Sequence, residues 1–340
     1  MNYQPPFTLT PASVRLVADI SETLGRVSAH MSQERALRLR RINRIRTIQG
    51  SLAIEGNTLS EAQITAILEG KRVLAPPREV QEARNAIRAY EGLAKWQPAN
   101  EKHLLEAHSL MTYGLVDDPG VYRQGGVGVM QGDKVIHMAP PAARVGVLIQ
   151  QLLEWLSESE HHPLIVSSVF HYEFEFIHPF SDGNGRMGRL WQTLVLSGWN
   201  PLFAHIPVES LIHEHQNDYY QALNQSTLKS DSAPFIEFML SMLQQALTQV
   251  AESHTPQESP QHTPQVKRLL LVLRGDMSRE ELQQALGLKD RKSFRERYLQ
   301  PALAAGLIEM TQPNQPNSKL QRYRVTESSA AIRLQTTPHR

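Results

Sequence analysis

Residues Ile177 to Arg189 read IHPFSDGNGRMGR, and this run joins two strongly apolar helical patterns. Upstream, apolar residues recur at helical spacing from Leu164 onward, and Pro179 disfavours helix at the residue before it. Downstream, a second helical pattern begins near Gly185. The sequence therefore predicts a helix, a short glycine-containing loop and a second helix, with His178 at the end of the first helix.

The loop has the residue types of an anion-binding site. Gly183 and Gly185 permit positive φ and close approach, so the N–H groups of Gly183, Asn184 and Gly185 can form an anion nest at a helix N-terminus. Arg186 lies in the first helical turn and Arg189 one turn later, so both can reach the same anion. A guanidinium grips phosphate oxygens in pairs, so the pattern favours a phosphate ligand.

Two other side chains suit chemistry on that phosphate. Asp182 would repel a phosphate unless a hard cation such as Mg²⁺ bridged the two. His178 can take a proton from an incoming hydroxyl, since histidine titrates at about pH 6.5. Taken singly, either residue also fits an ordinary helix cap or turn.

The whole run His178 to Arg189 resembles the signature HPFxDGNGRxxR of the Fic family, whose fold is shared with Doc, without a departure at any fixed position. The resemblance implies a mainly α protein, a Fic helical bundle with a β-hairpin flap, that transfers AMP from ATP to a protein hydroxyl. It makes His178 the general base and Asp182 the Mg²⁺ ligand. It assigns the α- and β-phosphates to Gly183, Asn184, Gly185 and Arg186, and the γ-phosphate to Arg189. Doc-like kinases carry a lysine where this chain has Gly185, which favours nucleotidyl transfer.

A second motif lies upstream, where Ser51 to Asn57 read SLAIEGN. Gly56 suits the position just beyond a helix, which places Glu55 at a helix end where the dipole disfavours a carboxylate. The run resembles the class II Fic inhibitory motif, [S/T]xxxE[G/N], which implies that Glu55 pairs with Arg189 and blocks the γ-phosphate. A surface glutamate at a helix end is the alternative, and a role in positioning water for AMP removal stays open.

Two other segments are assigned to the nucleotide and target sites. Short alternating runs on either side of Gly132-Asp133 predict a β-hairpin. In the family this is the flap, which holds the target protein by strand addition, and Val127, Gly128 and Val129 are assigned beside the nucleotide. Tyr219 and Tyr220 resemble the family's adenine contacts. A purely structural hairpin, and tyrosines used only for packing, remain the alternatives.

Composition limits the function classes. The chain has 340 residues, 41% hydrophobic and 20% charged, with a net charge of +1 and no cysteine. Disulfides and thiolate catalysis are excluded, and the net charge supplies no overall field toward nucleic acid or membrane. Without a signal-like N-terminus or a long apolar run, a cytoplasmic, non-membrane protein is expected.

Four regions are predicted: an N-terminal helical region with the inhibitory helix (1–98), a Fic catalytic domain (99–250), a proline- and glutamine-rich linker (251–265) and a winged-helix domain (266–330). The last has a capped helix at Ser278 and a basic second helix from Arg291 to Leu299. DNA contact through that helix would make the chain a DNA-binding regulator, with the Fic unit as a sensor. Protein contact or homodimer formation is the alternative.

Overall fold

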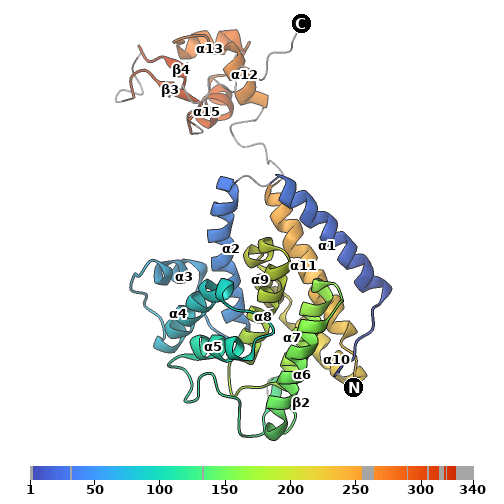
Figure 1. Ribbon diagram of the computed structural model, residues 1–340. Helices are drawn as coiled ribbons and strands as arrows, with labels where there is room; N and C mark the ends of the chain where they lie inside the picture. The colour runs from blue at the N-terminus through green and yellow to red at the C-terminus, as the bar shows by residue number, and fades with distance from the viewer. Residues whose placement is uncertain are drawn as a thin grey trace. The chain divides into compact units, whose positions relative to one another are not determined.

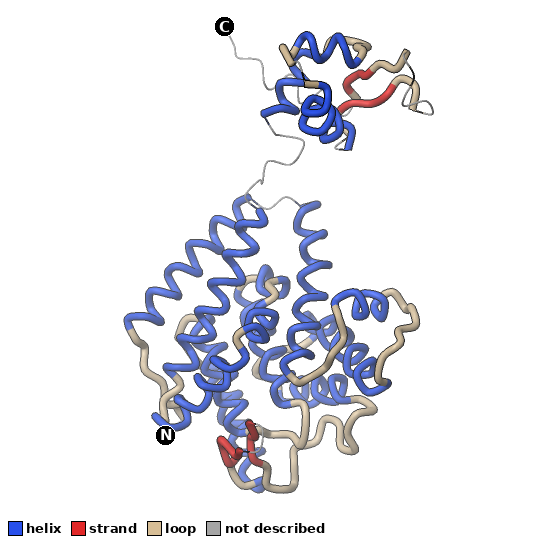
Figure 2. Tube along the Cα trace, turned by 180° about the vertical axis from the view of Figure 1, so that it is seen from behind, coloured by secondary structure: helices blue, strands red, loops and turns tan. Residues whose placement is uncertain are grey.

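The computed structural model describes residues 3–30, 33–131, 134–254, 264–288, 290–304, 306–313, 318 and 320–326. The chain divides into two compact units, Met1–His254 and Thr255–Arg340. Helices make up most of both (Figures 1 and 2), which confirms the mainly α class. The division predicted at residue 98 does not separate two units, because helices on both sides of it share one core.

The larger unit contains eleven named α-helices among its described residues, with three short 3₁₀ turns between them. The helices are α1 (Pro11–His30), α2 (Gln33–Ile54), α3 (Glu61–Leu68), α4 (Pro77–Gly92), α5 (Glu101–Thr112), α6 (Val145–Glu158), α7 (Pro163–Ile177), α8 (Asn184–Trp199), α9 (Val208–Glu214), α10 (Gln216–Lys229) and α11 (Ala233–His254). The 3₁₀ turns are η1 (Leu93–Lys95), η2 (Ala142–Arg144) and η3 (Pro201–His205).

Helices α7 and α8 form the centre of this unit and pack on each other. Every residue of α7 from Leu164 to Glu175 is buried, as expected of a helix that is covered on all sides. Trp191 of α8 is fully buried and donates its indole N–H to the Pro98 carbonyl, 2.8 Å away. The loop 178–183 is therefore held at both ends by buried helices.

Helix starts and ends follow the capping signals in the sequence. At α1, the Thr10 hydroxyl accepts from the Ser13 N–H, and Ser13 accepts from the Thr10 N–H, both at 3.0 Å. Capping boxes form at Ser60 before α3 and at Ser278 before α13 (Arg279–Ala285). These local bonds fix where the three helices begin, and the start at Ser278 is the one predicted from the sequence.

A single hairpin interrupts the helices in the described part of this unit. Strands β1 (Gly128–Gln131) and β2 (Lys134–Met138) pair antiparallel, with a register shift between Val129 and Met130. The hairpin was predicted, and its Gly132-Asp133 turn lies outside the described residues. Figure 2 shows the two strands at the end of the unit where long loops gather.

The smaller unit has helices α12 (Pro264–Val272), α13, α14 (Arg291–Phe294), the π-helical turn η4 (Arg295–Leu299) and α15 (Gln300–Ala304), followed by the antiparallel strands β3 (Ile308–Met310) and β4 (Tyr323–Val325). The order helix, turn, basic helix, hairpin is the one predicted. The linker predicted for 251–265 is shorter at both ends, since α11 runs to His254 and α12 begins at Pro264. Residues 255–263 lie outside the described part.

No helix in the described ranges is both long and apolar enough to cross a bilayer.

The packing of α2 on α9 generates a stability prediction. A Cβ at Gly50 of α2 would lie 2.5 Å from the Ser210 nitrogen and 2.6 Å from the Glu209 carbonyl carbon, both backbone atoms that cannot rotate away. Gly50→Ala should therefore lower the free energy of unfolding by about 1–3 kcal/mol. That loss corresponds to about 2–4 °C in Tm per kcal/mol, measured by calorimetry.

Gly25→Ala in α1 is the matched control. Nothing lies within 4 Å of a Cβ there, so the better helix propensity of alanine should raise stability by about 0.5–1 kcal/mol. Equal Tm shifts in the two variants would contradict the close contact at Gly50.

Candidate active site

His178 ends α7 in a conformation that is unusual for a residue with a side chain. It is the C-cap, with φ 50° and ψ 61°, and its N–H bonds to the Phe174 carbonyl at 2.9 Å. Left-handed backbone costs a non-glycine residue about 1–2 kcal/mol, so the surrounding structure must hold it. The conformation turns the chain sharply out of the helix directly at the candidate base.

Arg123 is the residue that holds this turn. It is buried, and its guanidinium donates to the carbonyls of His178 (2.7 Å) and Ile177 (3.2 Å). The same guanidinium donates to Gly125 O at 2.8 Å, just before β1, and to Pro140 O at 2.6 Å, just after β2. One side chain thus fixes the two roots of the hairpin to the end of α7.

The loop after His178 is closed by Asn184 and His108. The Asn184 amide accepts from the Phe180 N–H and donates to the Phe180 carbonyl, each at 2.9 Å. His108 of α5 stacks on the Phe180 ring with centroids 3.6 Å apart. Its Nδ1 accepts from the Gly120 N–H, so the proton is on Nε2, which donates to Asp182 O at 3.0 Å. Burial lowers the pKa of His108 to about 4, which keeps this ring neutral.

The Asp182 carboxylate lies at the mouth of the loop, with its side chain 41% exposed. Oδ1 accepts from the Gly183 N–H at 2.6 Å and from Arg186 Nη2 at 3.1 Å. Oδ2 accepts from Nη2 of Arg78, on α4, at 3.2 Å. Gly183 has φ 86°, and a Cβ there would meet the Thr112 methyl at 2.9 Å, so only glycine fits this N-cap of α8.

Two nitrogen atoms of Arg186 are buried without a hydrogen-bond partner among the described residues. The two atoms are Nε and Nη1, and the residue as a whole is buried. Buried guanidinium N–H groups without partners are costly, because they have lost water and gained nothing. Arg186 lies in the first turn of α8. The first N–H groups of this helix have no preceding carbonyl to accept from them, and they carry the positive end of the helix dipole.

Arg189 is already occupied by an anion. Its Nη2 lies 2.7 Å from Oε1 of Glu55, and the arginine is 2% exposed while the Glu55 side chain is 38% exposed. Ser51 holds the same guanidinium, with Nε donating to its hydroxyl at 3.2 Å and Nη2 to its carbonyl at 2.9 Å. Burial lowers the pKa of Arg189, but the charge and hydrogen bond of Glu55, together with smaller effects of Tyr219 and Glu175, more than offset it, so the pKa is raised.

Glu55 is presented by the end of α2, as the sequence predicts. Gly56 has φ 87° and donates to the Ala53 carbonyl, while Asn57 donates to Leu52 at 3.2 Å, which is a Schellman motif with Glu55 at the C-cap. A Cβ at Gly185 would overlap the Glu55 carboxylate. The carboxylate therefore sits directly on the first turn of α8.

A second buried layer supports the arginine. Glu209 accepts from the hydroxyls of Tyr90 (3.1 Å) and Thr193 (3.2 Å), and burial raises the pKa of Glu209 to about 7. On α7, Glu175 Oε2 lies 3.9 Å from Nδ1 of His178. Burial raises the pKa of Glu175 to about 8, since the nearby Arg189 offsets only part of the effect. Glu175 is therefore mostly protonated at neutral pH.

The two tyrosines of α10 differ in exposure. Tyr219 is buried, and its hydroxyl lies 3.3 Å from Nε2 of His171, whose Nδ1 lies 2.6 Å from the Gln192 side-chain oxygen. Burial lowers the pKa of His171 to about 3. Tyr220 is partly exposed, so its ring is the one of the pair that reaches the surface. Val127 and Gly128 are also partly exposed, at the start of β1, and the side chain of Val129 is not among those described.

The donor set suits Mg²⁺ held jointly with phosphates. Among the described residues, no three or more His, Asp or Glu side chains gather as they would around a metal held by protein alone. Mg²⁺ usually takes one or two carboxylates and completes its shell with water and phosphate oxygens. Asp182 supplies one exposed carboxylate next to the unpartnered nitrogens of Arg186, which fits that arrangement.

The sequence reasoning missed Arg123, His108, Arg78 and Glu175. All four lie outside the run from His178 to Arg189, and none stands at a spacing from other residues that forms a known motif. The one available signal was the run Gly120 to Arg123, where an arginine follows a turn just before the hairpin.

Comparison with known proteins gives the following matches. Residues 98–196 match the Fic/DOC family, and residues 264–326 match the domain described as "Filamentation induced by cAMP protein Fic-like, C-terminal domain". This chain is 30% identical to the protein adenylyltransferase Fic of Aedes aegypti over 217 residues, which are 60% of this chain. The matched segment spans 41% of that relative, so about three fifths of the relative has no counterpart in the match.

Solved structures agree over more of the chain. A Fic family protein from Desulfovibrio desulfuricans G20 is 50% identical, with a TM-score of 0.72, and the match covers 96% of this chain and 99% of the other. Fic-1 from C. elegans shares the fold at 22% identity, with a TM-score of 0.60, over 71% of this chain and 72% of the other.

The buried Glu175 generates a pH prediction. Its pKa is about 8 in the folded state and about 4.3 in an unfolded chain, so over the range between these values the folded state holds a proton that unfolding releases. Stability should therefore fall as pH rises from about 7 to 8, a range in which the titration of His171, at about 3 when folded and about 6.5 when unfolded, is largely complete in both states. Glu175→Gln should flatten this decline by up to about 1.4 kcal/mol per pH unit in urea titrations.

Glu154→Gln, an exposed glutamate on α6, is the control and should leave the slope unchanged. A Glu175→Gln protein whose stability declines as steeply as the wild type would show that Glu175 is ionised in the folded state.

Proposed function

This chain belongs to the Fic family, and from that membership we propose that it is a protein adenylyltransferase, transferring AMP from ATP to a hydroxyl side chain of a target protein or of itself. The observation that carries the proposal is Arg186, a buried arginine with unpartnered Nε and Nη1 at the N-terminus of α8. A phosphate chain supplies the oxygens that these nitrogens lack. The curated relatives named protein adenylyltransferase support the same activity.

In this proposal the residues divide the triphosphate between them. The amides of Gly183, Asn184 and Gly185 and the Arg186 guanidinium take the α- and β-phosphates, and Arg189 takes the γ-phosphate. A bound Mg²⁺ supplies neutralisation of phosphate charge, with Asp182 as its protein ligand. Tyr220 and the start of β1, Val127 to Val129, flank the nucleoside, with Tyr219 as packing support for Tyr220; their rings are 5.4 Å apart.

The chemical step follows from the position of His178. Its imidazole removes the proton from the target hydroxyl as the oxygen attacks the α-phosphorus. The bond from that phosphorus to the bridging oxygen breaks, and pyrophosphate leaves. Arg123 fixes the main chain on both sides of the base, so its contribution is to position His178 rather than to contact substrate.

The hairpin supports a target-binding role. It has two strands among the described residues, so each strand keeps one edge without a strand partner there. A target segment can add to such an edge through main-chain hydrogen bonds, which demand little of the target sequence. Because Arg123 ties both hairpin roots to the His178 carbonyl, a strand bound there would lie in fixed register to the base.

We propose that Glu55 inhibits the enzyme by holding Arg189. One guanidinium cannot bind a carboxylate at 2.7 Å and the γ-phosphate through the same nitrogen. Removal of AMP is the alternative role of the same residue. Oε1 engages Arg189, and no hydrogen bond in the described chain uses Oε2, which would be available to orient a water.

His178→Ala should reduce AMP transfer by about 10²- to 10⁴-fold, because the attacking hydroxyl loses its base. The measurement is incorporation from ATP labelled at the α-phosphate, with γ-labelled ATP run in parallel. Retention of the α label alone identifies nucleotidyl transfer. His213→Ala, an exposed histidine on α9, is the control and should match the wild type. Equal labelling by His178→Ala and His213→Ala would remove His178 from the reaction.

Glu55→Gly should raise AMP incorporation by about 5- to 150-fold, since a coupling of 1–3 kcal/mol is released when Arg189 becomes available. Glu69→Gly is a close control, because Glu69 is also a helix C-cap followed by a glycine, at the end of α3 and away from Arg189. If both variants, or neither, gained activity, the inhibitory role would be wrong. Loss of AMP from pre-labelled protein by wild type but not by Glu55→Gly would favour the removal activity.

A further inference from the structure

The smaller unit has a charge that the whole-chain value conceals. Between Pro264 and Thr326 there are twelve lysine and arginine residues and six aspartate and glutamate residues, a formal excess of six positive charges. The rest of the chain carries a formal excess of five negative charges, which brings the total to +1. A strongly basic segment of about sixty residues joined to an acidic remainder is typical of a unit with a polyanionic partner.

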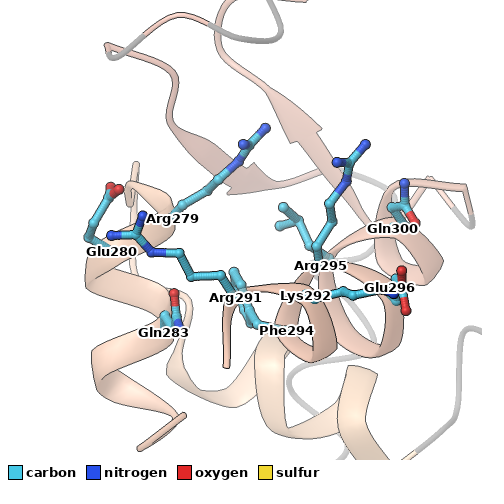
Figure 3. Close-up of a pocket in the computed structure, with 10 residues that line it drawn as sticks. Arg279, Glu280, Gln283, Arg291, Lys292, Phe294, Arg295, Glu296 and Gln300 are labelled. Atoms are coloured by element: carbon cyan, nitrogen blue, oxygen red, sulfur yellow. The ribbon is translucent and has the colours of Figure 1, made fainter. Parts of the chain in front are cut away.

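Part of this charge gathers around one hollow. A depression of about 630 Å³ lies between α13 and the helical run from α14 to α15. Its lining includes the cations Arg279, Arg291, Lys292 and Arg295, the amides Gln283 and Gln300, and the acids Glu280 and Glu296. Figure 3 shows Arg291 extending toward α13 beside Glu280 and Gln283, and Arg295 rising on the same side as Arg279.

Three of the four cations have no binding partner among the residues that the structure describes. No side-chain hydrogen bond or ion pair joins Arg291, Lys292 or Arg295 to another residue in the described part of the chain. Arg279 differs, because its Nε donates to the Tyr323 hydroxyl at 2.9 Å, which fixes that guanidinium to the edge of β4. The free cations therefore stand on one helical run, and a fixed one faces them from the neighbouring helix.

We propose that this basic hollow binds duplex DNA, with the phosphate backbone held by Arg279, Arg291, Lys292 and Arg295. Cations from two helix segments can contact phosphates on both sides of the helical run from Arg291 to Ala304, and a major groove about 12 Å wide admits one helix. Gln283 and Gln300 are side chains that pair with base edges, and a carboxylate such as Glu296 can accept from cytosine.

The same lining argues against the other polyanions. Single-stranded nucleic acid is bound largely by stacking of bases on exposed aromatic rings, whereas the aromatic residue that lines the hollow, Phe294, is buried. An acidic protein segment would not need the two amides, whereas duplex DNA presents base edges with which they can pair. The mixture of arginines, lysine and glutamines fits a ligand with both phosphates and base edges.

The test uses the full chain and a labelled 30-base-pair duplex of arbitrary sequence, with binding followed by fluorescence anisotropy at 50 and 200 mM KCl. The variant Arg291→Ala/Lys292→Ala/Arg295→Ala should weaken binding by about 10- to 100-fold at 50 mM. It should also reduce the slope of log K against log salt by about 2–3, because each phosphate contact contributes about 0.9.

The matched control is Arg274→Ala/Arg297→Ala/Arg324→Ala, which removes the same charge from exposed positions of the same unit outside the hollow. It should weaken binding less than threefold, and both triples should melt like the wild type. Equal losses in the two triples would overturn the site. Absence of duplex binding by wild type at 50 mM KCl, or equal binding of single strands or polyglutamate, would overturn the assignment to duplex DNA.

Discussion

The architecture of the larger unit depends on one buried cation. Arg189 lies in α8, one of the two central helices, and its guanidinium is almost fully removed from water. A buried charge without a partner is strongly destabilising. The guanidinium of Arg189 therefore needs an anion beside it, or water in the place of that anion. Ser51 supplies two neutral oxygens and Glu55 supplies the negative charge. The end of α2 is therefore held on α8 by electrostatics as well as by packing.

Around that cation the protein builds rigidity from main-chain contacts. Asn184 closes the loop on Phe180, His108 closes it on Asp182, and Arg123 closes it on His178. Each of these side chains forms its hydrogen bonds with main-chain carbonyls or amides. Arg186 differs, because its Nε and Nη1 have no hydrogen-bond partner among the described residues. Preorganisation of this kind is typical of sites in which positioning and charge stabilisation do most of the catalytic work.

The helices and the motif residues were predictable because their signals are local. The caps at Thr10, Ser60 and Ser278, and the glycine after Glu55, are read within four residues of the chain, and the structure agrees with all of them. Arg123 and His108 were not predictable. Their roles depend on carbonyls more than fifty residues away, and no spacing in the sequence encodes which carbonyls the fold will bring to them.

The net charge of the whole chain is a poor guide to the electrostatic field of either unit. A value of +1 averages an acidic unit with a basic one, so the overall field that the sequence argument used is not the field near either part. The boundary predicted at residue 98 does not coincide with a break in packing, because helices α2 and α4 pack into the same core as α7 and α8.

Gly185 leaves room for the carboxylate of Glu55. A side chain at this position would meet the carboxylate that reaches over from α2, which would have to turn away to make room. The lack of a single carbon atom at position 185 thus lets the end of α2, which is distant in the sequence, reach the first turn of α8.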